Sequence, residues 1–169
     1  MLFFFVNVFC SEENVWKLCE KLKKNNNIRI EEFYAVFVSN DQRLVPLFYQ
    51  KSAIDEGFSD GKVIWDYHVI LVQKGASEVN VFDMDCTLPF PSKFQLYCYF
   101  CLGSDQLLDP QFHRMFRVIP AEVYLTSFAS DRRHMKKING SWLKDPPPYE
   151  PIRCDSGLYD ILFFFINVR

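Results

Sequence analysis

Hydrophobic residues recur at every third or fourth position near the start of the chain, and polar residues fill the gaps between them. The apolar residues are Val15, Leu18, Cys19 and Leu22. This spacing puts them on one face of an α-helix. Ser11 is a favourable N-cap, the two glutamates after it suit the positive end of the helix dipole, and a Lys- and Asn-rich run follows Leu22. The pattern therefore predicts a helix over residues 12–24.

Runs rich in aromatic and β-branched residues follow, and turn residues bound each of them. Residues 32–39 (EFYAVFVS) and 44–50 (LVPLFYQ) are predicted strands, and Pro46 favours a sheet edge for the second. Residues 62–73 (KVIWDYHVILVQ) form the strongest strand pattern in the chain. Residues 78–85 (EVNVFDMD) form another predicted strand, which a turn separates from the preceding one.

The remaining segments complete the predicted fold. Residues 52–61 are a predicted loop, and residues 120–137 are a predicted helix that begins with a proline. Residues 145–151 (DPPPYEP) form an extended proline-rich segment. Because no linker divides the chain, we expect a single domain over residues 1–169. Its expected class is α/β in the broad sense (α+β), with helices packed on a mostly antiparallel sheet.

The composition supports a packed globular protein. Of its 169 residues, 49% are hydrophobic and 17% are aromatic, which argues against disorder. The net charge of −2 gives no electrostatic basis for binding nucleic acid, so we expect no such partner. The six cysteines are irregularly spaced, which favours reduced intracellular thiols over a disulfide scaffold. Cys98 and Cys101 form a lone C-x-x-C without a second ligand pair, so we expect half-buried thiols and no metal.

The two ends of the chain carry nearly the same apolar run, LFFFVNV at residues 2–8 and LFFFINV at residues 162–168. Each is far shorter than the roughly 20 apolar residues that span a bilayer, so no membrane segment is expected. The first run also lacks the basic region and the cleavage site of a secretory signal. Either these runs are buried terminal strands, or the atypical ends, residues 1–10 and 153–169, are translated non-coding sequence.

The register of the predicted hairpin brings a histidine near an acid. If residues 62–73 form one continuous strand, His68 shares a face with its alternate neighbours, which are Ile64, Asp66, Ile70 and Val72. If the hairpin turns at Gly75 and Ala76, then His68 lies directly opposite Asp83. A turn one residue longer would put Met84 there, and a turn two residues longer would put Asp85 there.

A histidine paired with a carboxylate acts as a base on a nearby thiol or hydroxyl. Cys10 and Ser11 stand side by side where the first helix is predicted to begin, and a helix N-terminus lowers a thiol pKa. Together with His68 and Asp83, they match the arrangement of a papain-like hydrolase. The alternative is that His68 is a structural strand histidine and Asp83 is a surface acid.

Several longer motifs give a more specific indication. In chain order they are SEENVWKLCE, YAVFVSN, VIWDYHVILV, FDMDCTLPFP, PQFHRMFRVIPAEVYL, FASDRRHMK and DPPPYEPI. On these motifs, and above all on W-D-Y-H and D-x-D-x-x-L-P-F-P, the chain resembles the protein N-terminal glutamine amidohydrolase family over residues 11–152.

This resemblance implies both an activity and a fold. The family deamidates an N-terminal glutamine of proteins and peptides to glutamate and releases ammonia, and the product then enters the N-degron pathway. The implied fold is an α-β-α sandwich related to papain-like and transglutaminase-like thiol enzymes. The implied protein is a monomer of the cytosol and nucleus that uses a Cys-His-Asp triad and neither metal nor cofactor.

By motif, the family histidine corresponds to His68 and the family aspartate to Asp83, while the cysteine position is occupied by Ser11. The substrate ammonium needs acidic or carbonyl groups around it, and position alone suggests three candidates. These are Glu12, Asp66 and Asp85. Each has an alternative role as a helix cap, a solvated acid or a structural hydrogen-bond acceptor.

The nucleophile position departs from the family pattern. Ser11 stands where the family has cysteine, and Cys10 lies one residue earlier. A hydroxyl is far harder to ionise than a thiol, so we expect weak or no activity from the chain as it stands. Two alternatives remain open: an inactive relative that binds peptides with N-terminal glutamine, and a papain-like hydrolase with another amide substrate. We also expect poor solubility, because absent family strands would expose apolar surface.

Overall fold

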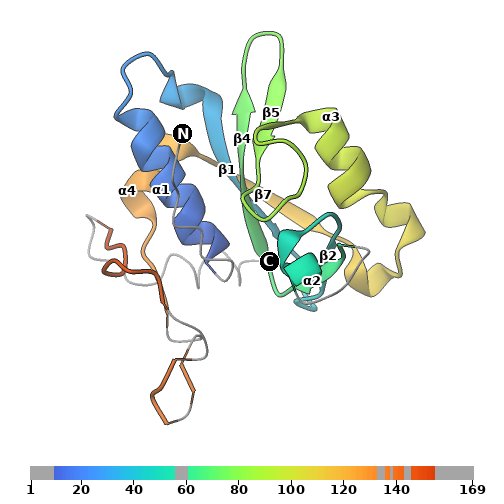
Figure 1. The fold of residues 1–169 in the computed structure, drawn as a ribbon. Coiled ribbons are helices and arrows are strands. Elements are labelled where there is room, and N and C mark those ends of the chain that lie inside the picture. Colours follow the sequence, from blue (N-terminus) through green and yellow to red (C-terminus); the bar gives the residue numbers. More distant parts are fainter. Residues whose placement is uncertain (1–9, 56–60, 133–135, 138, 143–145, 155–169) are drawn as a thin grey trace.

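The computed structural model describes residues 10–55, 61–132, 136–137, 139–142 and 146–154 (Figure 1). Its centre is a five-stranded antiparallel sheet with the order β6-β5-β4-β1-β7. These strands are β1 (Phe33–Ser39), β4 (His68–Lys74), β5 (Val79–Phe82), β6 (Ser92–Lys93) and β7 (Met115–Pro120). A small second sheet pairs β2 (Val45–Leu47) with β3 (Val63–Trp65). The predicted mixture of helices and a mostly antiparallel sheet is confirmed.

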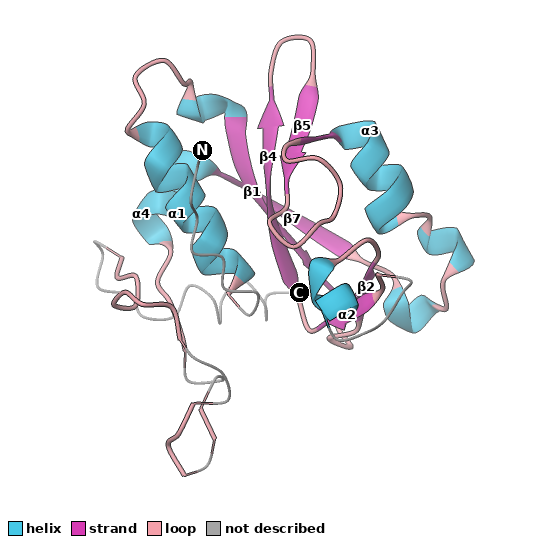
Figure 2. Ribbon diagram, in the orientation of Figure 1, coloured by secondary structure: helices cyan, strands magenta, loops and turns pink. Residues whose placement is uncertain are grey.

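Helices lie on both faces of the larger sheet (Figure 2). They are α1 (Ser11–Lys23), α3 (Phe94–Tyr97) and α4 (Ala121–Ser127), and a short helix, α2 (Lys51–Asp55), follows β2 along the chain. The helix α1 contacts β4 and α4 on one side of the sheet, whereas α3 contacts β5 and β6 on the other. Side chains alternate along each strand, so one apolar set packs under α1 and α4. That set includes Ala35, Phe37, Val69 and Leu71, and the set under α3 includes Val36, Ile70 and Val81.

The first helix begins one residue earlier than the pattern predicted. Ser11 is its first residue, so the prediction that Ser11 caps the helix is wrong. Cys10 is in the N-cap position, its side chain makes no capping hydrogen bond, and its carbonyl accepts from the Asn14 backbone N–H at 2.9 Å. The Ser11 hydroxyl instead connects two elements, because its Oγ accepts a hydrogen bond from the Val69 backbone N–H in β4 at 3.1 Å. This contact fixes the start of α1 against the start of β4.

The predicted strand over residues 62–73 is broken into two. Its first part, β3, pairs with β2, and its second part, β4, pairs with β1 and β5. Between them the chain leaves both sheets at Asp66 and Tyr67, where the Asp66 carboxylate accepts from the Tyr67 backbone N–H at 2.9 Å. The prediction that Ile64 and Asp66 share one strand face with His68 is therefore wrong. Pro46 lies in β2 of the two-stranded sheet, where every strand is an edge, as predicted.

The hairpin between β4 and β5 is two residues longer than the shortest turn considered. Leu71 pairs with Phe82 and Val72 with Val81, and the Gly75 backbone N–H closes the loop on the Glu78 carbonyl at 2.9 Å. The strand β5 ends at Phe82, before the ladder would reach His68. The prediction that His68 and Asp83 pair directly across the ladder is therefore wrong. The observed register is that of the turn two residues longer, in which the position opposite His68 belongs to Asp85.

The later part of the chain is less helical than predicted. Among the described residues between 120 and 137, only Ala121–Ser127 form a helix, because the backbone becomes extended at Phe128. The Ser130 backbone N–H then donates to the Ile152 carbonyl at 2.9 Å, so the segment pairs locally with the stretch after the prolines. The predicted loop over residues 52–61 starts with the last part of α2. The Phe-rich runs at residues 2–8 and 162–168 lie outside the described residues.

Two further findings concern only the described part of the chain. None of its helices is long and apolar enough to cross a membrane. In the same residues, no three His, Cys, Asp or Glu side chains gather in a way that could hold a metal ion. The thiol of Cys101 is fully buried, 3.1 Å from that of Cys86, so the prediction that it is half-buried is wrong, whereas Cys98 is half-buried as predicted.

Candidate active site

His68 and Asp83 meet although the ladder does not pair them. His68 is the first residue of β4, and Asp83 follows the last residue of β5, where the chain turns out of the sheet. His68 Nε2 donates a hydrogen bond to Asp83 Oδ1 at 3.0 Å. The exposed fractions are only 2% for His68 and 5% for Asp83, so water hardly weakens this contact.

The two groups shift each other's ionisation. Burial by itself lowers the pKa of His68, but the charge and hydrogen bond of Asp83 outweigh it, so the pKa is raised. Burial by itself raises the pKa of Asp83, but His68 and the other donors around the carboxylate outweigh it, so the pKa is lowered. Both shifts strengthen the pairing: the ionised Asp83 holds an imidazole proton on Nε2, and the raised pKa makes the ring a stronger base.

Three side chains that the sequence reasoning did not single out surround this pair. The Tyr97 hydroxyl donates to Asp83 Oδ2 at 2.8 Å, and Gln50 Nε2 donates to the same oxygen at 3.4 Å. Trp65 Nε1 donates to Gln50 Oε1 at 3.3 Å, and its ring stacks on the His68 ring with 5.1 Å between centroids. Trp65 could have been found from the W-D-Y-H motif. Gln50 and Tyr97 carry no sequence signal, because they reach Asp83 from distant elements.

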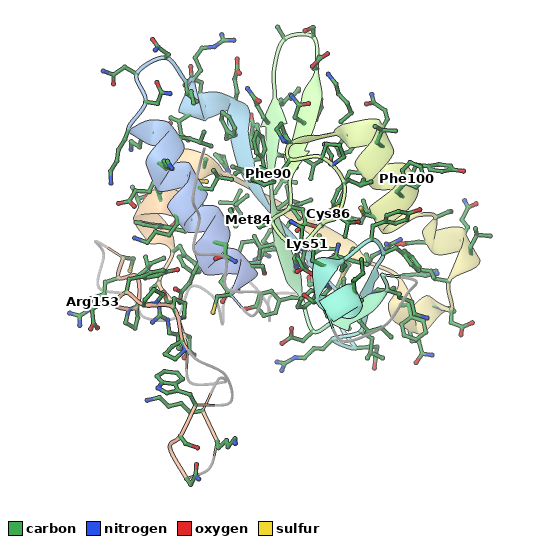
Figure 3. The ribbon with its side chains drawn as sticks, viewed as in Figure 1. Lys51, Met84, Cys86, Phe90, Phe100 and Arg153 are labelled. Atoms are coloured by element: carbon green, nitrogen blue, oxygen red, sulfur yellow. The ribbon has the colours of Figure 1, made fainter. Side chains whose placement is uncertain are left out.

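His68 and Asp83 both line a small pocket. Its lining residues are Ser11, Asn14, Val15, His68, Val69, Asp83, Met84 and Asp85. Among the described residues, His68 Nδ1 is the buried side-chain nitrogen or oxygen atom without a hydrogen-bond partner. Lys51 Nζ donates to the Met84 carbonyl at 2.9 Å, and both residues are labelled near the centre of the view in Figure 3. A ring nitrogen without a partner beside a pocket is suited to take a proton from a group inside it.

The structure places Ser11, and not Cys10, at this pocket. The Ser11 side chain lines it from the first turn of α1, while Cys10 is fully buried and is not one of the lining residues. Burial raises the pKa of Cys10 to about 12, and the charges of Glu12 and Glu13 act in the same direction. Cys10 therefore stays a protonated thiol at neutral pH.

The three candidate acids differ in where they lie. Asp85 lines the pocket, and the Ser52 hydroxyl donates to its carboxylate at 2.7 Å. Burial raises the pKa of Asp85, and the nearby charge of Asp83 acts in the same direction. Glu12 is buried, and this burial raises its pKa to about 7. Asp66 is not a lining residue, and its carboxylate accepts the Tyr67 backbone N–H.

A buried ion pair holds the start of α1 in place. Arg132 donates to both carboxylate oxygens of Glu13, from Nε at 2.8 Å and from Nη2 at 2.6 Å. Its remaining nitrogen, Nη1, donates to the Tyr149 carbonyl at 2.8 Å. On the other side, the Tyr124 hydroxyl donates to the Glu12 carbonyl at 3.0 Å. These contacts join α1 to α4 and to the segment after the prolines, so the helix start that presents Ser11 is rigidly placed.

The structure thus combines an α+β fold with one pocket that a hydroxyl at a helix start and a buried His–Asp pair line. The chain belongs to the N-terminal glutamine amidase family, whose model matches residues 5–169. This match is wider than the region of residues 11–152 that the motifs indicated.

Individual relatives agree with the family match. The chain is 48% identical over 156 residues to the protein N-terminal glutamine amidohydrolases of Drosophila erecta and Drosophila melanogaster. It is 47% identical to the protein of the same name from Drosophila pseudoobscura pseudoobscura. Each of these alignments covers 92% of this chain and 74% of the relative.

Proposed function

We propose that this protein is a protein N-terminal glutamine amidohydrolase. It hydrolyses the side-chain carboxamide of a glutamine at the N-terminus of a protein or peptide, which yields glutamate and ammonia. The observation that carries the proposal is the His68 side chain, bonded to Asp83 through Nε2 and left with Nδ1 unpartnered beside the pocket that Ser11 lines. The chain that carries this site is 48% identical to proteins of that name.

The proposed catalytic residues are Ser11, His68 and Asp83. His68 Nδ1 accepts the Ser11 hydroxyl proton while Oγ attacks the carboxamide carbon, and Asp83 stabilises the imidazolium that results. The same imidazolium then protonates the leaving nitrogen, so that ammonia departs and an acyl-enzyme remains. His68 next takes a proton from water, whose oxygen attacks the acyl carbon. The bond from that carbon to Ser11 Oγ breaks, His68 returns the proton to Oγ, and glutamate leaves. Backbone N–H groups at the start of α1 are the natural donors to the oxyanion.

The fold type of a papain-like or transglutaminase-like thiol enzyme is part of this proposal. It is supported by the nucleophile position on the first turn of a helix, by the histidine that begins β4 and by the aspartate that directly follows the neighbouring strand β5. In such a site a thiol at position 11 is the natural nucleophile, because the helix N-terminus and an imidazolium both stabilise a thiolate. A serine hydroxyl gains much less, so we expect the chain with Ser11 to be weakly active.

The substrate ammonium would lie beside acids at the pocket. Asp85 is the best placed of the three candidates, since it lines the pocket next to Asp83. Glu12 lies one residue after Ser11, and its raised pKa of about 7 leaves it partly protonated at neutral pH. Asp66 would act from outside the lining. A bound ammonium would favour the ionised form of any of these carboxyls.

The remaining expectations are proposals of the same kind. The protein would work as a monomeric single domain over residues 1–169, without metal or cofactor, and with neither nucleic acid nor membrane as a partner. Its substrates would be proteins and peptides with N-terminal glutamine, met in the cytosol and nucleus, and its products would feed the N-degron pathway. One observation favours a second candidate function: with Ser11 in place of cysteine, the chain would bind N-terminal glutamine peptides without hydrolysing them.

A mass-spectrometric assay tests these alternatives. The chain and its Ser11→Cys variant are incubated with a peptide that begins with glutamine and with a matched peptide whose glutamine is internal. We expect slow deamidation of the first peptide by the chain, fast deamidation by Ser11→Cys, and none of the second peptide. Ser104→Cys, which adds an exposed thiol far along the sequence, is the matched control and should not gain activity.

Each other outcome has a definite meaning. Binding of the N-terminal glutamine peptide without hydrolysis, even by Ser11→Cys, supports the peptide-binding function. Hydrolysis of the internal glutamine alone contradicts the proposed function and supports an amide hydrolase of different specificity.

A further inference from the structure

The two oxygens of the Asp83 carboxylate have different partners. Oδ1 accepts from His68 Nε2 and from the Asp85 backbone N–H, both at 3.0 Å. Oδ2 accepts from the Tyr97 hydroxyl at 2.8 Å and from Gln50 Nε2 at 3.4 Å. Tyr97 thus makes the shortest of the four contacts, and it does so on the side of the carboxylate that faces away from His68.

Tyr97 is itself firmly placed. Its exposed fraction is 1%, and it packs in the apolar cluster of Val36, Ile70 and Val81 under α3. It ends the α-helical part of α3, and the next residues, Cys98–Leu102, form a π-helical turn closed by the Gly103 backbone N–H on the Cys98 carbonyl at 2.8 Å. Such turns occur often at functional sites. Burial and the charge of Asp83 keep the pKa of Tyr97 well above its ordinary value, so the phenol remains a donor.

We propose that Tyr97 is a positioning residue for the reaction, because its hydroxyl orients the Asp83 carboxylate and thereby sets the orientation of His68. A hydrogen bond to the charged form of an acid favours that form, so Tyr97 also keeps Asp83 ionised. An ionised Asp83 holds the imidazole proton on Nε2, which leaves Nδ1 free to act as a base toward Ser11. The kinetic part of this inference rests on the proposed function.

Gln50 is a weaker second support of the same carboxylate. Its amide lies 3.4 Å from Oδ2, and its oxygen accepts from Trp65, which stacks on the imidazole. The Gln50 backbone is fixed by a hydrogen bond to the Gly61 carbonyl at 2.8 Å. Gly61 has φ +63°, and a Cβ there would lie 3.0 Å from the Tyr49 Cα, so a glycine is required. Loss of the Gln50 amide should therefore act in the same direction as loss of the Tyr97 hydroxyl, but less strongly.

An NMR titration of the Asp83 carboxyl and the His68 ring tests the proposal without any need for activity. Tyr97→Phe removes only the hydroxyl, and we expect it to raise the pKa of Asp83 by about one, the effect of one hydrogen bond to a buried carboxylate. Gln50→Leu should raise it less. Tyr124→Phe is the matched control, since it removes an equally buried hydroxyl that donates to a backbone carbonyl, and it should leave Asp83 unchanged.

Activity gives a second readout in the Ser11→Cys background. There, Tyr97→Phe should lower kcat about tenfold, the factor that corresponds to one hydrogen bond, with KM unchanged. The acidic limb of the kcat/KM profile should move to higher pH. An Asp83 pKa that Tyr97→Phe leaves unchanged, or that Tyr124→Phe moves as far, would overturn the proposal, as would an unchanged kcat. If Ser11→Cys hydrolyses no peptide, the proposed function fails, and the titration alone still decides the role of Tyr97.

Discussion

His68 Nε2 and Asp83 Oδ1 lie 3.0 Å apart between two almost fully buried side chains, and this contact determines which ring nitrogen remains for chemistry. Because Asp83 occupies Nε2, the unpartnered Nδ1 is left beside the pocket that Ser11 lines. Tyr97 and Gln50 hold the far oxygen of the same carboxylate. The pair is therefore oriented from both ends before any substrate arrives.

The two neighbouring positions 10 and 11 should differ sharply in thiol reactivity. Cys10 should resist alkylation at neutral pH, because it is buried and its pKa is raised to about 12. A thiol placed by Ser11→Cys should react at pH 6 to 7, since the imidazolium and the helix N-terminus stabilise its thiolate. Iodoacetamide labelling followed by peptide mapping measures both sites.

The role of His68 can be read in the same experiment. In a Ser11→Cys, His68→Ala double variant, the thiol at position 11 should lose its reactivity below about pH 8, near the ordinary thiol pKa. Equal labelling with and without His68 would contradict the arrangement of the pocket.

Glu12 should make the protein less stable as the pH rises. Its pKa is about 7 in the folded chain against 4.5 for an ordinary glutamate, because burial disfavours the charged form. Its stabilising contribution is therefore complete below about pH 4.5 and is lost as the pH rises through about 7. Glu12→Gln should remove this loss and raise the free energy of unfolding at pH 8 by on the order of 3 kcal/mol. Urea unfolding at pH 4.5 and pH 8 measures it.

Glu20→Gln is the matched control for this experiment. It makes the same substitution in the same helix, but the Glu20 side chain is 34% exposed and pairs with Lys24. Its effect should be below about 1 kcal/mol at either pH, as for surface ion pairs in general. A Glu12→Gln variant whose stability follows the same pH dependence as the unaltered chain would rule out a raised pKa for Glu12.

The buried pair of Arg132 and Glu13 should be important for stability. Arg132→Met leaves the Glu13 carboxylate buried without its partner, which should lower the free energy of unfolding by about 3–5 kcal/mol. Adding Glu13→Gln to Arg132→Met should restore part of the loss, because the buried charge is then gone. Lys24→Met, which breaks the exposed pair of Lys24 with Glu20 at the C-terminal end of α1, should change stability by less than about 1 kcal/mol. Comparable losses in both Met variants would show that burial of the pair is unimportant.

The strand β7 should promote self-association. Phe116 and Val118 are 49% and 59% exposed at the edge of the sheet, and they line an apolar groove of about 690 Å³ together with residues of β1, β4 and α3. Val118→Lys should raise the concentration at which the protein aggregates several-fold, since a charge on an edge strand opposes edge pairing. Its effect on the free energy of unfolding should stay within about 0.5 kcal/mol. Light scattering against concentration provides the measurement.

Val123→Lys tests whether the position of the charge matters. Val123 is 50% exposed on α4, which lies in the other helical layer. The added charge is the same, but no sheet edge is altered, so aggregation should change little. If both lysine variants improve solubility equally, net charge and not the apolar groove is responsible.

Local features of the fold could be predicted from the sequence. The apolar period of 3.6 predicted α1 to within one residue at each end, and the run of aromatic and β-branched residues at 32–39 predicted β1, because both patterns depend on neighbouring residues only. The D-x-D and W-D-Y-H motifs indicated Asp83 and His68. The catalytic roles assigned to them and to Ser11 remain predictions.

What depends on contacts distant in sequence was decided by the tertiary structure. The predicted strand around Trp65 is broken because the chain passes from one sheet to the other through Asp66 and Tyr67. The hairpin register depends on how the turn closes at Gly75. The Tyr97 hydroxyl reaches Asp83 from α3, an element separate from both β4 and β5. Residue patterns by themselves determined the family, predicted α1 and β1, and indicated the candidate residues Ser11, His68 and Asp83. Packing decided the register, the orientation of the imidazole and the burial of Cys10 away from the pocket, because these depend on how separate elements meet in space.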